Sequence, residues 1–210
     1  MFASALWAVD QLYHAVEANV TRWNFQGGAT SLYGTISVQN NIAVANPIFY
    51  GLWLFTDATA GDAQVVPCSV SGSDGKNLVA WCTQTNAWQG QSTYQQGRSC
   101  NTRIVVVFLN KEVASTIEAV GVSIDLGGLS ENHSPEAYLR VLAPKSNGAY
   151  AKNGIVFAGQ TFDGSTTGLP LGVPSVQTIN ISPSSPSVSI LFSAGESTIS
   201  VVEVFDGCSA

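Results

Sequence analysis

The runs Arg103-Ile-Val-Val-Val-Phe-Leu109 and Thr198-Ile-Ser-Val-Val-Glu-Val-Phe205 decide the fold class of this chain. Both are rich in β-branched residues, whose side chains pack well on a pleated sheet. Gly, Ser, Pro and Asn separate them from similar runs after residue 62. Those runs are 63–70, 77–83, 116–124, 138–143, 176–181 and 187–193. Eight short strands with frequent turn residues predict a mainly β protein, an antiparallel β-sandwich of about eight strands.

The chain has a different pattern before residue 60. Apolar residues recur at steps of three and four from Phe2 to Val20, which predicts an amphipathic helix. The segment Arg22-Trp-Asn-Phe25 predicts a short strand. Asn46-Pro47 is a typical helix start, because it combines an N-cap residue with proline at the first helical position.

The second helix, Ile48-Phe-Tyr-Gly-Leu-Trp-Leu-Phe55, is apolar almost all round, so we expect it to be buried. The chain is thus divided into a helix–strand–helix segment, 1–60, and a β-sandwich, 61–210. We expect the two to form one compact unit, because 210 residues suffice for one good-sized core.

Composition excludes several classes of function. Charged residues make up only 10% of the chain, and eight Lys and Arg against fourteen Asp and Glu give a net charge of -6. A nucleic-acid binder needs clustered cations, so nucleic acid is excluded as a partner. The longest apolar run, 48–55, is far shorter than the ~20 residues that a membrane-spanning helix requires.

The polar segment 83–101 is a candidate glycan site, because seven of its nineteen residues are Gln or Asn. Sugars commonly stack on an aromatic ring while amides bind their hydroxyl groups. Trp88 and Tyr94 would supply the rings, and Asn86, Gln89 and Gln91 the amides. In the alternative interpretation Trp81 anchors the core, and Trp88 and Tyr94 pack the loop. We expect this loop and the one at 145–175 to contain no strands.

The cysteines and sequons favour a secreted protein. Four cysteines suit one or two disulfides, and they lack the spacing of a zinc site. Asn-x-Ser/Thr sequons make Asn19, Asn132 and Asn180 candidates for N-glycosylation. The first ten residues lack the basic region of a signal peptide, so we expect a processed or unconventional export route.

The titratable residues do not form a recognisable catalytic motif. His14 lies one helical turn from Asp10 and from Glu17, and His133 lies in a loop; we interpret both as structural or surface residues. No Gly-x-Ser-x-Gly elbow accompanies them. Four carboxyls near turns could form a pair, but we expect them to be solvated: Asp125, Glu131, Glu136 and Asp163. No metal and no cofactor is predicted.

Several short segments, taken in order, resemble the last βα units and the C-terminal β-sandwich of family 79 glycoside hydrolases, the fungal β-glucuronidase and heparanase group. These segments are Phe2-Ala-Ser-Ala-Leu-Trp-Ala-Val-Asp10, Trp23-Asn-Phe-Gln-Gly-Gly28, Pro47-Ile-Phe-Tyr-Gly-Leu-Trp-Leu-Phe55, Ala80-Trp-Cys-Thr-Gln-Thr-Asn86 and Thr102-Arg-Ile-Val-Val-Val-Phe-Leu-Asn110. The resemblance implies that residues 1–60 correspond to the end of a (β/α)8 barrel. It also implies a disulfide between Cys82 and Cys208, leaving Cys68 and Cys100 as a second pair.

The resemblance also implies what this chain lacks. The nucleophile and the acid/base of that family lie on barrel strands upstream of the matched segments, and neither motif occurs here. The loop with Gln26, Gly27 and Gly28 corresponds to the barrel rim near the sugar.

We therefore expect a secreted, non-catalytic protein that binds glycans or cell-surface glycoconjugates, such as a fungal lectin or an immunomodulatory protein. One alternative is a processed chain or fragment of a β-glucuronidase-type enzyme that needs a partner chain with the catalytic barrel. Another is a purely structural module. Self-association is expected as well, because helix faces that would meet a barrel would otherwise be exposed.

Overall fold

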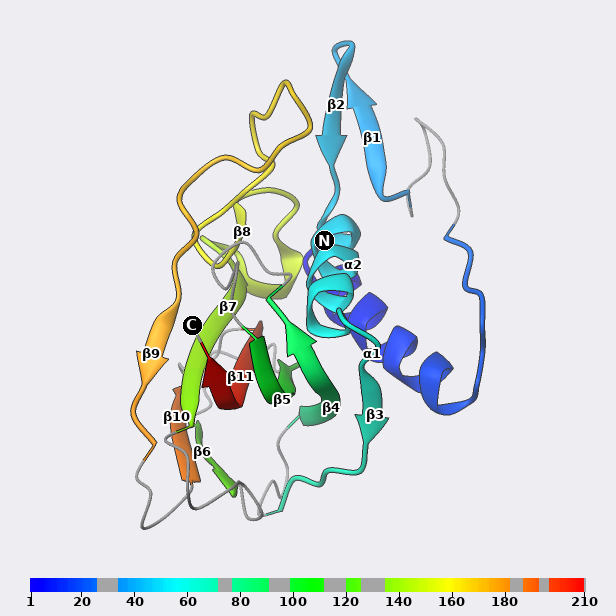
Figure 1. Ribbon diagram of the computed structural model, residues 1–210. Helices are drawn as coiled ribbons and strands as arrows, with labels where there is room; N and C mark the ends of the chain where they lie inside the picture. The colour runs from blue at the N-terminus through cyan, green and yellow to red at the C-terminus, as the bar shows by residue number, and fades with distance from the viewer. Residues whose placement is uncertain are drawn as a thin grey trace.

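A computed structural model describes residues 1–25, 34–71, 77–90, 99–111, 120–125, 135–181, 187–192 and 197–209. Figure 1 shows two helices beside a sheet and a hairpin that projects beyond them. The helices are α1 (Ala3–Glu17) and α2 (Pro47–Ala58), and the hairpin between them consists of β1 (Ile36–Gln39) and β2 (Ile42–Ala45).

The main sheet is antiparallel, with the strand order β3-β4-β5-β11-β7-β8, and β9 also pairs with β7. A second, two-stranded sheet pairs β6 with β10. A 3-10 helix, η1 (Gly148–Tyr150), follows β7. The strands are β3 (Gln64–Val66), β4 (Leu78–Gln89), β5 (Ser99–Asn110), β6 (Val120–Asp125), β7 (Glu136–Pro144), β8 (Ile155–Phe157), β9 (Gln177–Ile179), β10 (Ser187–Phe192) and β11 (Thr198–Ser209).

The two faces of the main sheet are covered by different elements. Successive side chains of a strand point to opposite faces, so in β5 Val105 and Val107 pack with the helices and Val106 packs with β6 and β10. The helix side of the first core contains Phe2, Leu6, Val9, Tyr13, Tyr50 and Leu54. The protein is therefore layered, with helices on one side of the main sheet and a small sheet on the other (Figure 1).

The fold class predicted from the sequence is confirmed, and all eight predicted runs contain strands. Both predicted helices form, although α1 ends at Glu17 and Val20 lies beyond it. The expected strand at 22–25 is wrong, because this segment has no strand partner in the described part of the chain.

The expectation of two strandless loops is also wrong. β4 continues to Gln89 and β5 begins at Ser99, so most of the polar segment is a continuation of the central hairpin. Its amide-rich sequence is compatible with strands because β5 pairs with β4 on one side and β11 on the other along its length. The second loop contains the short strand β8, which pairs with β7.

The hairpin of β1 and β2 was missed by the sequence analysis. Its turn residues, Asn40 and Asn41, have φ angles of 51° and 62°. Two successive positive φ values define the two-residue turn that joins twisted strands, and asparagine tolerates this conformation. The alternation Ile-Ser-Val-Gln before Asn-Asn was the signal that could have revealed it.

The predicted disulfide pairing is wrong. The disulfides join Cys68 to Cys82 and Cys100 to Cys208. Cys208 lies opposite Cys100 in the register of β11 and β5, whereas Cys82 lies opposite Val106. Six residues along a strand are about 20 Å, so Cys82 and Cys208 cannot reach each other.

Self-association stays a prediction, because α2 is packed against α1 and the sheet while Trp7 and Val16 of α1 are exposed. α2 packs against α1 so closely that a Cβ on Gly51 would lie 2.7 Å from the carbonyl oxygen of Ala5. Tyr50 and Leu54 are fully buried against the sheet core. The expectation that α2 is buried is confirmed for the face that packs against α1 and the sheet core.

Candidate functional site

Three of the residues predicted to bind glycans lie in the described part of the chain, namely Asn86, Trp88 and Gln89. Trp88 is only 1% exposed, so its ring is not available for a sugar to stack on. Asn86 and Gln89 are exposed, and their amide groups bond to Gln84 and Ser99. Other predicted residues lie outside the described part of the chain, namely Gln91, Tyr94, Gln26, Gly27, Gly28 and Asn132. Asn19 and Asn180 are exposed.

Trp88 is buried because the backbone of β4 changes direction one residue earlier. Ala87 has a φ of 50°, a left-handed conformation that interrupts the regular alternation of side chains. The indole therefore packs beside Gly61 and Phe205, on the face that carries the end of α2. Arg103 lies over the ring, 5.7 Å from its centroid. The burial of Trp81 and Trp88 thus agrees with the alternative interpretation, in which these rings pack inside the protein.

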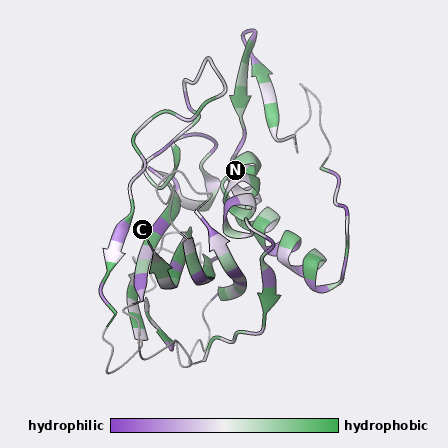
Figure 2. Ribbon diagram, viewed as in Figure 1, coloured by the Kyte–Doolittle hydropathy of each residue, from purple (hydrophilic) through white to green (hydrophobic). Residues whose placement is uncertain are grey.

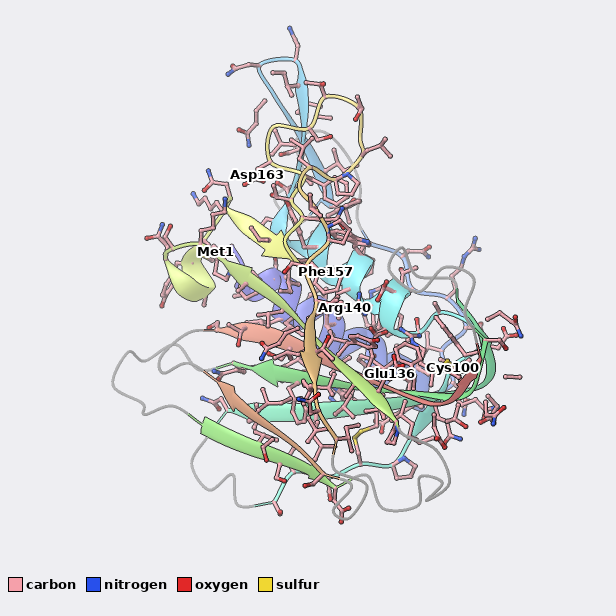
Figure 3. The ribbon with its side chains drawn as sticks, turned by 60° about the vertical axis from the view of Figure 1, so that its left-hand side comes forward. Met1, Cys100, Glu136, Arg140, Phe157 and Asp163 are labelled. Atoms are coloured by element: carbon pink, nitrogen blue, oxygen red, sulfur yellow. A yellow bond between two sulfur atoms is a disulfide. The ribbon has the colours of Figure 1, made fainter. Side chains whose placement is uncertain are left out.

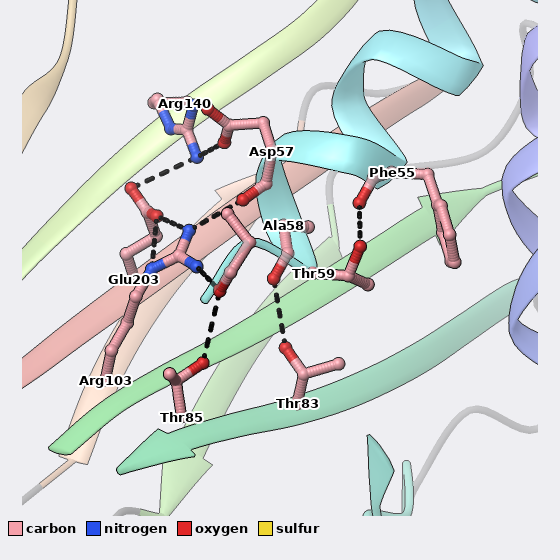
Figure 4. Close-up of polar contacts among 10 residues, drawn as sticks. Phe55, Asp57, Ala58, Thr59, Thr83, Thr85, Arg103, Arg140 and Glu203 are labelled. Atoms are coloured by element: carbon pink, nitrogen blue, oxygen red, sulfur yellow. Dashed lines mark hydrogen bonds and ion pairs between the residues drawn. The ribbon is translucent and has the colours of Figure 1, made fainter. Parts of the chain in front are cut away.

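Arg103, Arg140, Glu203 and Asp57 form a charged network between the sheet and the end of α2 (Figure 4). Arg140 Nη2 lies 2.5 Å from Asp57 Oδ2 and 3.1 Å from Glu203 Oε2, and Arg103 binds Glu203 through two of its nitrogens. Burial, followed by the charge of Asp57, raises the pKa of Glu203 well above its usual value. Burial also lowers the pKa of Arg103 to about 10.

Asp57 and Glu203 resemble a catalytic pair only in that two carboxyls lie close together. Glu203 is fully buried, and both carboxyls are held by arginine side chains. A glycoside hydrolase needs one carboxyl on each side of an accessible glycosidic bond. This network is therefore structural, and no substrate can lie between its carboxyls.

Two titratable residues of α1, Asp10 and His14, also have structural partners. Asp10 accepts a hydrogen bond from Trp81 Nε1 at 3.1 Å and pairs with Lys111 at 2.6 Å, while His14 contacts the Trp81 ring.

In the described part of the chain, no three His, Cys, Asp or Glu side chains are grouped so that they could hold a metal ion. None of the helices in that part is long and apolar enough to cross a membrane.

A pocket of about 370 Å³ lies between two arms that project beyond the main sheet. One arm is the hairpin of β1 and β2, and the other is the segment 158–175 (Figure 1). We call this the two-armed pocket, and its lining residues are Ile36, Asn41, Ile42, Ala43, Ala45, Phe49, Phe162, Ser165, Thr166 and Gly168. Its volume is within the range of small-ligand sites. Figure 2 shows that both strands of the hairpin are largely hydrophobic.

The hairpin arm is attached to the start of α2 through Asn46. The Asn46 side-chain amide donates to the carbonyl of Gly34 at 2.8 Å, and Ser37 Oγ donates to Asn46 Oδ1 at 3.1 Å. These bonds join both ends of the hairpin at its base. These bonds consequently fix the orientation of the hairpin relative to Phe49, which lies in the first turn of α2.

The second arm is attached to α2 through Tyr50. The Tyr50 hydroxyl accepts from the backbone N–H of Phe162 at 2.8 Å and donates to Asp163 Oδ1 at 3.3 Å. Asp163 Oδ2 in turn accepts from the N–H of Gly154 at 2.5 Å. Figure 3 shows Asp163 at the end of the molecule that carries the hairpin. These bonds place the Phe162 ring 4.9 Å from that of Phe49, at 85°, in edge-to-face contact.

The chemistry of the pocket is uncharged and amphipathic. Two aromatic rings and several aliphatic side chains form most of its wall, and hydroxyls from Ser165 and Thr166 and the amide of Asn41 provide hydrogen-bonding groups. Such a wall can bind the C–H face of a ring while its polar groups bind hydroxyls. None of these residues was predicted as a site residue, because they come from two stretches far apart in the sequence, 36–49 and 162–168.

Comparisons with known proteins give similarities of structure alone. No family model and no curated protein matches the chain. A 4-O-α-L-rhamnosyl-β-D-glucuronidase from Fusarium oxysporum has a TM-score of 0.49 and 14% identity, covering 82% of this chain and 31% of that one. A family 51 α-L-arabinofuranosidase from Bifidobacterium longum has a TM-score of 0.48 and 13% identity, covering 95% and 34%. The chain spans about a third of the length of these two glycoside hydrolases.

Proposed function

We propose that this chain is a non-catalytic protein that binds a glycan in the two-armed pocket. The observation that carries the proposal is the wall of that pocket, where two aromatic rings lie beside hydroxyl and amide groups with no charged side chain among them. Sugar rings have an apolar face and a rim of hydroxyls, so this wall has the complementary chemistry.

The proposal that the protein has no hydrolase activity rests on its carboxyls. The close pair, Asp57 and Glu203, is bound to arginines at the end of α2, and Asp163 is bound to Tyr50 and Gly154. We also propose that the protein is secreted, since disulfides persist in oxidising compartments and all four cysteines are paired. Lectin-like and immunomodulatory roles would follow from glycan binding at cell surfaces.

The purified chain is expected to leave 4-nitrophenyl β-glucuronide intact, because the close carboxyl pair of the described residues, Asp57 and Glu203, is bound by arginines and closed to a substrate. Release of 4-nitrophenolate is measured over hours, with a known β-glucuronidase as the positive control. Turnover that co-purifies with the chain would overturn the non-catalytic proposal. The alternative, a fragment of a β-glucuronidase-type enzyme, predicts turnover only after a chain with the catalytic barrel is added.

Ala43→Trp is expected to abolish binding on a glycan array, because the indole would fill the pocket from the exposed face of β2. Gln39→Trp is the matched control, since it adds the same side chain to an exposed position of the same hairpin outside the pocket lining. Equal binding by the two variants would place the glycan elsewhere, and an array on which the unmodified chain binds nothing would overturn glycan binding. The purely structural module remains the alternative in that case.

A further inference from the structure

None of the described residues that line the two-armed pocket has a side chain that could balance a negative charge. The ten lining residues are all uncharged. The hairpin arm, residues 34–46, contains no charged residue, and the second arm, residues 158–175, contains one, Asp163.

The carboxylate of Asp163 is held beside the pocket by the structure itself. It bonds to the Tyr50 hydroxyl and the Gly154 N–H, and the preceding residue is Phe162, whose ring forms part of the pocket wall. No cationic side chain of the described residues forms an ion pair with Asp163. The negative charge of Asp163 therefore opposes the approach of an anion. The net charge of -6 acts in the same direction.

The cations of the described residues lie elsewhere. Arg103 and Arg140 are buried in the network at the end of α2, and Lys111 pairs with Asp10. Lys145 and Lys152 do not line the pocket; Lys145 packs near Gly154. A carboxylate that left water for this pocket would therefore lose its hydration without gaining an ion pair, which is unfavourable.

We infer that the pocket is specific for neutral sugars and discriminates against uronic acids and other anionic sugars. This inference rests on the proposed glycan binding. The specificity arises from the lack of a compensating cation in the wall, and the aromatic and hydroxyl groups supply the affinity for the neutral ring.

The test begins with a glycan array that carries neutral and anionic glycans, followed by titration of one matched pair. Methyl β-glucoside and methyl β-glucuronide differ only at C6, a hydroxymethyl group in one and a carboxylate in the other. We expect neutral glycans to dominate the array. In calorimetry at pH 7 and low salt the glucuronide should bind about tenfold or more weakly than the glucoside. If the array identifies a different pair of neutral and anionic glycans, the same difference is expected between its two members.

Thr166→Lys introduces a cation at the exposed edge of the pocket, and Thr167→Lys is the matched control one residue outside the lining. The first variant should narrow or reverse the preference for the neutral sugar, and the second should leave it nearly unchanged. The effect of the first variant should weaken in high salt.

The outcomes separate this inference from the function on which it rests. An array dominated by uronic or sialic acids, or tighter binding of the glucuronide by the unmodified chain, would overturn the specificity but leave glycan binding intact. An array without any bound glycan would overturn glycan binding itself, and the inference with it.

Discussion

Replacing Arg103 with methionine is expected to lower the free energy of unfolding by about 3–5 kcal/mol, the cost typical of breaking a buried ion pair from one side. Arg103 is 1% exposed and its guanidinium binds Glu203, which is fully buried. Without it, the carboxyl of Glu203 would keep Arg140 as its partner and lose the contacts to Arg103. The measurement is urea unfolding followed by tryptophan fluorescence.

Arg103 also donates hydrogen bonds at the end of α2, which adds to the expected decrease in the free energy of unfolding. The last carbonyls of a helix have no partner within the helix. Arg103 donates to the carbonyls of Asp57 and Ala60, and Thr83 donates to that of Ala58 at 3.2 Å (Figure 4). The substitution therefore removes one donor from each of the Asp57 and Ala60 carbonyls, as well as one guanidinium from the carboxyl of Glu203.

Lys111→Met is the matched control for Arg103→Met. Lys111 also forms an ion pair with a carboxylate, that of Asp10, but its side chain is 34% exposed. Partly exposed pairs of this kind contribute about 0–1 kcal/mol. If both substitutions changed the unfolding free energy equally, burial would not be the cause and the structural role assigned to the network would be wrong.

Trp88→Ala is expected to destabilise the protein by about 3–5 kcal/mol, as for other large buried aromatic side chains. The substitution would open a cavity among Phe205, Cys100 and the turn after α2, and would remove the contact with Arg103. Thermal unfolding by circular dichroism measures the change.

Gln89→Ala is the control for Trp88→Ala, because Gln89 is the exposed next residue of the same strand. It should change stability by less than about 0.5 kcal/mol. If Trp88→Ala folded with normal stability and lost glycan binding, the indole would be a ligand contact and the two-armed pocket would not be the whole site. The burial of Trp88 argues for the opposite result.

Trp88 and Arg103 show where sequence patterns cease to predict the position of a side chain. The alternation of side chains along β4 predicts which face each residue occupies only while the backbone stays extended, and the positive φ at Ala87 interrupts it. Likewise, Arg103 and Glu203 are 100 positions apart, and their contact depends on the pairing of β5 with β11. A run such as Arg103 to Leu109 indicates a strand, but it does not identify the neighbouring strand.

The disulfides and the pocket illustrate the same limit. The number of cysteines is compatible with two disulfides, but register decides which sulfurs meet, and it places Cys100 opposite Cys208. The pocket needs the hairpin, the start of α2 and residues 162–168 together. The Tyr50 hydroxyl, which joins α2 to the second arm, belongs to an apolar run that predicted only burial.

The class of the fold, the positions of both helices and eight of the strands can be predicted from the sequence alone, because these depend on the local periodicity of apolar and β-branched residues. The composition also shows the low content of charged residues, which agrees with the uncharged wall of the pocket. Only the tertiary structure decided the layers, the disulfide pairing, the burial of Trp88 and the place of the pocket. Each of these depends on contacts between segments distant in sequence, whose register and approach are set by the packing of the whole chain.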